Sequence, residues 1–391
     1  MSRIEELIAE LCPNGVEYTK IGDIATVARG VRVVRNQLAE TGDFPVYQNS
    51  IKPLGYHDKS NVKAYSAFVI GAGAAGEIGF SDTDFWAADD CYYFICPDSL
   101  NNRYLYFVLM KNQPLILSRV RKASIPRLSR TVIENLVIPV PPIEVQTEIV
   151  KVLDNFTELT AELTAELTAR KKQYEYYRDY LLDFGRNGGV WQGSCEWRTI
   201  KDICKTICSG GTPNSKNKEY YGGNIPWLRT QEVDFCEITE TGLSITESGL
   251  NNSSAKWIPK NSVIVAMYGA TVGKVAYTSI PLTTNQACCN LEVNEDIALF
   301  KYVYYWLANK YEYIKSLGQG SQTNINAQIV KDLQIAIPSL NEQERIVNIL
   351  DRFDKLCNDI SEGLPAEIEA RRKQYEYYRD KLLSFEEMKN A

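Results

Sequence analysis

Short apolar stretches rich in β-branched and aromatic residues alternate with turns of Gly, Asn and Asp through most of the chain. Residues 67–70 and 262–265 are typical of buried strands, and a glycine-containing turn follows each of them. Aromatic stretches with helical spacing begin near Arg103 and Tyr302. The pattern predicts an α+β fold in which mixed, β-rich sheets are combined with short helices.

Two longer stretches have helical periodicity instead. Residues 144–184 contain no Pro and no Gly, which predicts a helix of roughly 60 Å that ends at Gly185. The second stretch covers residues 341–385, and Gly363 and Pro365 should break it, with Pro365 opening a new helix. Because long helices are stabilised mainly by packing an apolar stripe, we expect the two to pack against each other.

The chain contains an internal repeat. Residues 172–179 have the sequence K-Q-Y-E-Y-Y-R-D, and residues 373–380 have the same sequence. Weaker matches precede it: Pro141, Gln146, Ile149, Leu153, Asp154 and Phe156 recur as Pro338, Gln343, Ile346, Leu350, Asp351 and Phe353. A period near 200 residues is too long for a solenoid and indicates two similar domains, each followed by a similar helix.

The predicted boundaries are a first domain at 1–142, a central helix at 143–184, a second domain at 185–339 and a C-terminal helix at 340–391. The central helix carries T-A-E-L tetrads, whose Leu159, Leu163 and Leu167 form a slowly rotating stripe. One tetrad adds about 6 Å and about 40° of rotation. The first helical stretch has 17 positions between Phe156 and Gln173, whereas the second has 21 between Phe353 and Gln374, so the twofold is approximate.

Composition narrows the function classes. The formal net charge is −6, which argues against a sequence-independent polyanion binder but allows a DNA reader with basic residues gathered on one face. Ten cysteines without a C-x-x-C pair, and one histidine, predict reduced thiols and no metal site. We expect His57 to be a surface residue. No apolar run has the length of a membrane span, and no signal peptide is evident, so we expect a cytoplasmic protein.

The best candidate for contacting phosphates and bases is a basic loop that begins at Arg119 and has no acidic residue among twelve. Its counterpart in the second half is rich in amides, which suit adenine edges as arginine suits guanine. The first-half candidates are Arg29, Arg32, Arg35, Gln48, Asn49, Arg119, Arg121, Lys122, Arg127 and Arg130. The second-half candidates are Lys216, Lys218, Arg229, Thr230, Gln231, Gln319, Ser321, Gln322, Asn324 and Asn326. Asn285 and Gln286 can equally serve as hydrogen-bonding residues at a strand end.

Other motifs have less specific signals. G-A-G-A-A-G at residues 71–76 fits the dinucleotide fingerprint, but E-I-G-F follows it instead of a helix, and a tight turn is the stronger interpretation. N-I-P-W at residues 224–227 faintly matches a methyltransferase motif and fits a strand entry better. We predict no catalytic residues. The repeated Tyr174, Tyr177, Tyr375 and Tyr378 suit packing between the two long helices, or a share in binding a partner.

Two variable domains, each followed by a helix bearing K-Q-Y-E-Y-Y-R-D, together with the T-A-E-L tetrads, resemble the specificity subunit of Type I DNA restriction–modification enzymes. The resemblance covers the whole chain. It implies two target recognition domains held apart by two antiparallel helices in a coiled coil, with each domain recognising one half of a bipartite DNA site.

The resemblance also implies a non-catalytic subunit that binds no cofactor itself. Two modification subunits would carry S-adenosylmethionine, and restriction subunits that translocate DNA would use ATP and Mg²⁺. Two other hypotheses stay open: a nucleotide-dependent enzyme that uses residues 71–76, and a purely structural coiled-coil scaffold.

Overall fold

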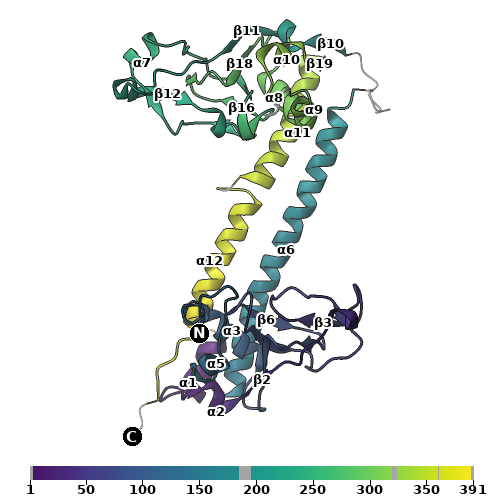
Figure 1. Ribbon diagram of the computed structural model, residues 1–391, viewed down its shortest axis with the longest axis vertical. Helices are drawn as coiled ribbons and strands as arrows, with labels where there is room; N and C mark the ends of the chain where they lie inside the picture. The colour runs from purple at the N-terminus through teal and green to yellow at the C-terminus, as the bar shows by residue number, and fades with distance from the viewer. Residues whose placement is uncertain (1–2, 185–194, 319–323, 360, 389–391) are drawn as a thin grey trace. The chain divides into compact units, whose positions relative to one another are not determined.

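The computed structural model describes residues 3–184, 195–318, 324–359 and 361–388; of Arg35 only the backbone is described. The chain divides into two compact units. Unit 1 comprises residues 1–165 and 367–391, and unit 2 comprises residues 166–366. Each unit therefore contains one globular domain and parts of both long helical stretches (Figure 1).

The domain of unit 1 combines small sheets with short helices. Its helices are α1 (Arg3–Leu11), α2 (Ile21–Ile24), η1 (Arg35–Gln37), α3 (Asn102–Lys111), α4 (Gln113–Ser118) and α5 (Arg130–Glu134). Its strands are β1 (Tyr18–Lys20), β2 (Thr26–Arg29), β3 (Phe44–Tyr47), β4 (Tyr56–His57), β5 (Ser66–Ile70), β6 (Ile78–Ser81), β7 (Trp86–Ala87), β8 (Cys91–Ile95) and β9 (Val137–Pro139). They form sheets in the orders β2-β8-β5-β6, β4-β3-β7 and β1-β9.

The domain of unit 2 repeats this arrangement. Its strands are β10 (Glu196–Thr199), β11 (Cys204–Ser209), β12 (Tyr221–Leu228), β13 (Glu237–Ile238), β14 (Ser244–Ile245), β15 (Val263–Ala266), β16 (Val275–Thr278), β17 (Thr283–Thr284), β18 (Cys288–Val293) and β19 (Gln334–Ile337). Its helices are η2 (Ile200–Ile203), η3 (Lys218–Tyr220), η4 (Thr230–Glu232), α7 (Glu247–Asn251), η5 (Gly269–Thr271), α8 (Phe300–Asn309), α9 (Tyr311–Ser316) and α10 (Ala327–Asp332). The sheet orders β11-β18-β15-β16-β13, β14-β12-β17 and β10-β19 match those of unit 1 strand for strand, with β13 added. The predicted α+β class with two related domains is confirmed.

Hydrophobic burial explains why these segments fold as they do. β5 and β15 are buried along their whole length, as their apolar sequences predict, and α3 and α8 cover their sheets with buried aromatic side chains. Tyr104 and Tyr302 occupy the same place, and their hydroxyls donate to the carbonyls of Pro139 and Ala336. Residues 224–227 lie inside β12, so their interpretation as strand is confirmed.

The long helical stretches are α6 (Ile143–Leu181), α11 (Leu340–Asn358) and α12 (Leu364–Leu382). The second stretch is interrupted between α11 and α12, beside Gly363 and Pro365. In unit 1 the first half of α6 lies beside α12 (Figure 1), where the Phe156 ring stacks on Tyr378. Within the described segments, no helix is both long enough and apolar enough to cross a bilayer.

The repeated glutamines show how each domain holds its outgoing helix. Gln146 is fully buried at the start of α6, and its amide nitrogen donates to the carbonyls of Pro141 and Ser99. Its oxygen accepts the backbone N–H of Asn101 at 2.8 Å. Gln343 in α11 makes the corresponding three bonds. Because an unsatisfied buried polar group costs about 1–3 kcal/mol, each glutamine stabilises the junction by satisfying three backbone groups at once.

Ion pairs reinforce both junctions. Asp154 on α6 pairs with Arg103 on α3 at 2.7 Å, and the Arg103 guanidinium also lies over the ring of Phe80. In unit 2, Asp351 pairs with Lys301 at 2.7 Å and accepts a hydrogen bond from Tyr305. The repeated aspartates are thus anchors between helix and domain.

His57 departs from expectation. Its side chain is only 8% exposed, and its ring stacks on Trp86 at 4.3 Å between centroids. The prediction of a surface histidine is wrong, because the neighbouring β7 brings an aromatic partner that is distant in sequence.

Candidate nucleic-acid interface

Three segments of unit 1 that are far apart in sequence converge on the turn between β5 and β6. The carbonyl of Gly71 accepts the N–H of Leu128 at 2.8 Å. The N–H of Gly73 donates to Pro126, and the N–H of Ala74 donates to Asn49. The turn at residues 71–76 therefore holds the basic loop on one side and the segment after β3 on the other.

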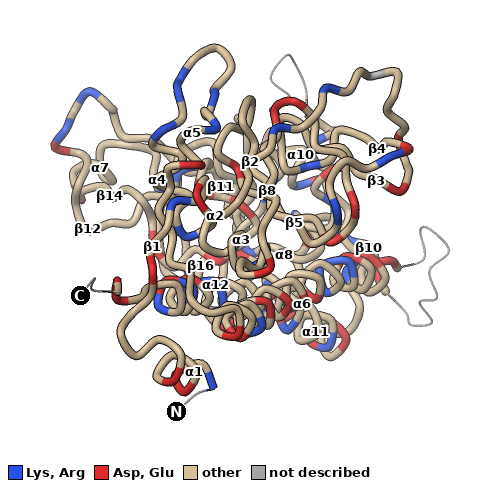
Figure 2. The backbone as a smooth tube through the Cα atoms, turned by 90° about the horizontal axis from the view of Figure 1, so that it is seen from below, with Lys and Arg blue, Asp and Glu red and all other residues tan. Residues whose placement is uncertain are grey.

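The basic loop, residues 119–130, connects α4 to α5 (Figure 2). It doubles back on itself, because Arg121 and Arg127 exchange backbone hydrogen bonds of 2.9 and 3.2 Å. Leu128, only 2% exposed, anchors it in the core, while Ile125 near its tip is 53% exposed.

The basic side chains of this loop differ in their surroundings. Arg119, Arg121, Lys122 and Arg127 are exposed, and none of them forms an ion pair with a described residue. Arg130 instead begins α5 and pairs with Glu134 at 3.0 Å. It is therefore a helix residue with an acidic partner, and its contact with DNA stays a prediction. The other four cations are available to bind an anionic partner.

The remaining first-half candidates lie near this turn to different degrees. Gln48 and Asn49 directly follow β3, and the carbonyl of Asn49 bonds to the turn. Arg29 donates from Nε to the carbonyl of Asp89, next to the Asp90 carbonyl that accepts from Gly71. Arg32 is exposed, and the side chain of Arg35 lies outside the described atoms.

Unit 2 builds the same arrangement with other side chains. The N–H of Ile325 donates to Met267 at 3.0 Å, as that of Leu128 does to Gly71. Thr271 donates from its hydroxyl to the carbonyl of Thr230, which corresponds to Asn49. The turn between β15 and β16, the segment after β12 and the segment before α10 therefore converge as in unit 1.

The polar groups of unit 2 are more strongly engaged with one another. Arg229 pairs with Glu232 at 3.3 Å, and the exposed Gln231 faces the same guanidinium. Asn326 caps α10 by accepting the N–H of Ile329 at 3.0 Å. Asn324 accepts, more weakly, from Gly269 at 3.4 Å.

Lys216 and Lys218 are exposed and have no ion pair with a described residue. Gln319, Ser321 and Gln322 lie outside the described residues. Asn285 accepts from the N–H of Ala287 just before β18, as expected for a strand end. Thr212, which sequence reasoning missed, donates to Gln286, and only the folded β-structure brings these two residues together.

The glycine motif at residues 71–76 is a tight turn whose N–H groups bond to other parts of the same chain. The N–H groups of Gly71, Gly73, Ala74 and Gly76 all donate to backbone carbonyls of the chain, and β6 follows the turn. Gly73 has a φ of +84°, and a Cβ there would lie 2.8 Å from Cβ of Asn49. This geometry lacks the helix N-terminus that binds a pyrophosphate, so it does not favour the nucleotide hypothesis.

The repeated tyrosines pack within helix pairs. Tyr378 stacks on Phe156 in unit 1, with centroids 5.4 Å apart, and Tyr177 stacks on Phe353 in unit 2 at 5.7 Å. Tyr375 lies against Phe107, and burial raises its pKa to about 12. Tyr174 lies near Phe353, at 6.2 Å. Packing between the long helices, the first interpretation of these residues, is thus confirmed for Tyr174, Tyr177 and Tyr378, whereas Tyr375 packs on α3 of the domain.

Two residues of the repeated octapeptide point outward. Tyr176 is 65% exposed and Tyr377, its counterpart, is 62% exposed. Sequence reasoning missed both, although their spacing from Tyr174 and Tyr375 is incompatible with the same helix face. Leu159, Leu163 and Leu167 are half-buried along α6.

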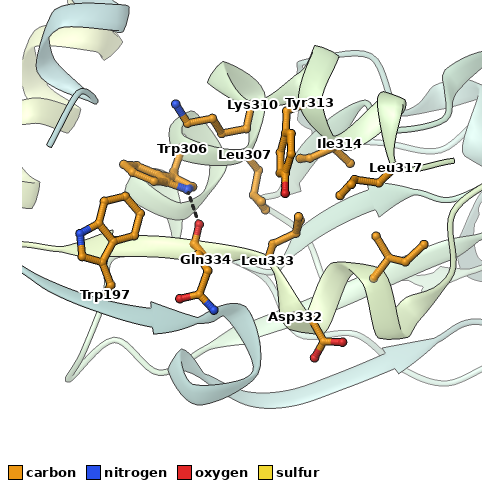
Figure 3. Close-up of a pocket in the computed structure, with 11 residues that line it drawn as sticks. Trp197, Trp306, Leu307, Lys310, Tyr313, Ile314, Leu317, Asp332, Leu333 and Gln334 are labelled. Atoms are coloured by element: carbon orange, nitrogen blue, oxygen red, sulfur yellow. Dashed lines mark hydrogen bonds between the residues drawn. The ribbon is translucent and has the colours of Figure 1, made fainter. Parts of the chain in front are cut away.

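A largely apolar pocket of 560 Å³ opens elsewhere in unit 2 (Figure 3). Trp197 and Trp306 meet there edge to face, 5.7 Å apart, and the indole of Trp306 donates to the carbonyl of Gln334. Asp332, the one carboxylate of this lining, accepts from Gln328 at 2.9 Å. Its walls are typical of packing and do not provide paired acid–base groups.

Comparison with known proteins bears on the whole arrangement. The family model described as the Type I restriction modification DNA specificity domain matches residues 13–170 and again 194–370. The chain is 43% identical to the Type I restriction enzyme EcoR124I/EcoR124II specificity subunit of Escherichia coli, over 63% of this chain and 61% of that protein. It is 30% identical to a putative type I restriction enzyme specificity subunit of Haemophilus influenzae, over 95% of this chain and 96% of that protein.

Solved structures share the fold at low sequence identity. The S subunit of a Type I restriction–modification system from M. genitalium superposes with a TM-score of 0.65 at 17% identity, covering 94% of this chain and 96% of that chain. The HsdS subunit from Thermoanaerobacter tengcongensis gives a TM-score of 0.51 at 15% identity, covering 95% and 97%.

Proposed function

The chain belongs to the Type I restriction modification DNA specificity family, and from this premise we propose that it selects the DNA sequence for a Type I restriction–modification enzyme. Each domain would bind one half of a bipartite site in double-stranded DNA. The chain itself would carry out neither methylation nor cleavage.

One observation carries the proposal. Both domains gather three corresponding segments on one turn, and they share the backbone hydrogen bond that holds the segment before α5 or α10, yet they place different side chains there. A shared framework with variable side chains suits two readers of unlike half-sites, because specificity depends on donors and acceptors presented to base edges.

The two domains would bind DNA by different chemistry. The basic loop offers Arg119, Arg121, Lys122 and Arg127, which suit phosphates and guanine. In unit 2 the candidates are mainly amides and hydroxyls, with Lys216 and Lys218 nearby. We therefore assign base contacts in the second half-site to amide groups of residues 319–326 and to Gln231.

The proposed contribution of α6, α11 and α12 is to set the distance between the half-sites. Two readers on a helical spacer recognise sites whose separation equals their own. A tetrad of about 6 Å corresponds to between one and two base steps of about 3.4 Å.

Modified-base sequencing tests the proposal. A genome from cells that express this chain with its modification subunits should carry methylation at one bipartite sequence, and the modification should vanish when the gene is removed. Exchanging residues 1–142 for those of a relative should change one half-site and leave the other intact. Methylation that is indifferent to the gene would refute the proposal.

The partners we propose are two modification subunits, which would carry S-adenosylmethionine, and restriction subunits that use ATP and Mg²⁺. The identical octapeptides present Tyr176 and Tyr377 to solvent at the same position. Identical surfaces suit two copies of one partner, and exposed tyrosines are common at the centres of interfaces.

Changing Tyr176 and Tyr377 together to alanine should weaken binding of the modification subunits at least about tenfold, because truncating an interface hot spot costs about 2 kcal/mol or more. Calorimetric titration measures this change in affinity. Tyr65 is 70% exposed and lies outside the helices, so Tyr65→Ala is a matched control that should bind normally. Equal affinity of the double variant and the control would remove these tyrosines from the interface.

A further inference from the structure

The two helical connections between the units have unequal lengths but join the same pairs of rings. Phe156 stacks on Tyr378 in unit 1, and Tyr177 stacks on Phe353 in unit 2. The first connector runs from Phe156 to Tyr177 and the second from Phe353 to Tyr378. Each connector therefore begins and ends at a ring that packs against the other connector within one unit.

The second connector has more residues between its two ring contacts than the first connector has. The first covers 21 positions as uninterrupted helix, about 31 Å, whereas the second covers 25 positions, which would be about 37 Å if it were helical. The excess is four residues, or one tetrad.

The sequence locates the excess. Leu159 corresponds to Leu356 on the N-terminal side, and Leu163 corresponds to Leu364 on the C-terminal side. From there A-E-L-T-A-R in the first connector matches A-E-I-E-A-R in the second. The four excess residues therefore lie between Leu356 and Leu364, and we place them at residues 360–363, which keeps Glu162 opposite Asp359.

The structure folds residues 361–363 back on the end of α11. The carboxylate of Asp359 accepts the Ser361 hydroxyl at 2.6 Å and the N–H groups of Ser361 and Glu362 at 2.7 and 3.1 Å, and these bonds lower its pKa. The N–H of Gly363 donates to the carbonyl of Asp359. A Cβ at Gly363 would lie 2.6 Å from the carbonyl oxygen of Lys355, so the turn packs this closely because the residue is glycine. The turn therefore adds chain without adding comparable length.

We propose that this turn is a store of one helical turn, which offsets the difference in length between the connectors and lets the second connector follow a longer α6, so that half-site spacing can change with the number of tetrads alone. The inference rests on the proposed function. With one more tetrad in α6, both connectors would have 25 positions, and the turn would open to follow. A second added tetrad would require more residues than the four that the turn can supply.

Four forms of the full chain test the proposal: the unchanged chain, one with residues 360–363 removed and Pro365→Ala, one with residues 161–164 duplicated, and one with both changes. Removal alone should leave the methylated spacer and the melting temperature unchanged. Duplication alone should fold and lengthen the spacer by about one or two base pairs. The combined form should melt at least about 5 °C below either single form, because its connectors cannot both reach.

A length control separates the number of residues from their identity. Four alanines in place of residues 360–363, with Pro365→Ala, should restore tolerance of the duplicated tetrad. A combined form as stable as the duplication alone, or a spacer that shifts on removal alone, would overturn the inference. The melting temperature and the helix content can be measured without DNA. If no form directs methylation, the proposed function fails while the stability ranking still decides the length argument.

Discussion

Changing Arg119, Arg121 and Arg127 together to glutamine should lower the DNA affinity of the assembled complex about 10²- to 10³-fold at physiological salt. These arginines are exposed on the basic loop and have no ion pair among the described residues, so their charge is available to phosphates. Each lost phosphate contact should also reduce the slope of log affinity against log salt by about 0.9. Binding measured between 50 and 200 mM salt, roughly the range over which counterion release is prominent, gives both quantities.

A control with the same charge change uses Lys20, Lys59 and Lys63, which are exposed in the same unit but outside the three converging segments. Their change to glutamine should alter the affinity by less than about threefold, since scattered surface charges act over little more than a Debye length. Equal losses in the two variants would mean that net charge, and not the basic loop, determines binding. Loss of affinity with an unchanged salt slope would point to base contacts instead.

Sequence periodicity predicted the elements that depend on local pattern. β5 and β15 are apolar throughout, and the run without Gly or Pro became the single helix α6. The repeated Gln146 and Gln343 were visible as a pair, but their function was not, because their bonding partners are carbonyls and N–H groups with no side-chain signature. The sequence could show that a residue recurs, and only the fold showed why.

The candidate site could be assembled only in three dimensions. Gly73 and Ala74 bond through their N–H groups to the carbonyls of Pro126 and Asn49, and such backbone hydrogen bonds leave no trace in residue type. The same limit applies to the ion pairs of the candidates. Arg130 and Arg229 have the composition of free cations, but Glu134 and Glu232 pair with them one helical turn away. A basic residue followed by an acid at position i+3 or i+4 was the available signal.

The difference in length between the two connectors is visible in the sequence, but its position is visible only in the structure. The two connectors differ in length by four residues, and the sequence places the conspicuous tetrads in the first connector, within α6. The structure places the excess in the second connector, at the turn before Gly363. The difference in length is thus a property of both connectors, and α6 is the uninterrupted one.

Deleting one tetrad, residues 161–164, should abolish methylation of the original sequence and create methylation at sites with the same two half-sites and a spacer about one or two base pairs shorter. The deletion removes about 6 Å and about 40° of rotation from α6 but leaves every residue of both domains in place. The turn beside Gly363 would then hold eight excess residues instead of four, and connections of this kind lengthen at small entropic cost. Modified-base sequencing measures the new spacer directly.

Replacing residues 161–164 by four alanines preserves helix length and serves as the control. Ala161, Glu162 and Thr164 are exposed and Leu163 is half-buried, so this variant should stay folded and methylate the original sequence. Alanine also has the highest helix propensity, which keeps α6 continuous. A deletion variant that retains the original spacer would show that α6 does not set the distance, and the second connector would then have to do so alone. An altered half-site would show that the tetrads shape the recognition domains themselves.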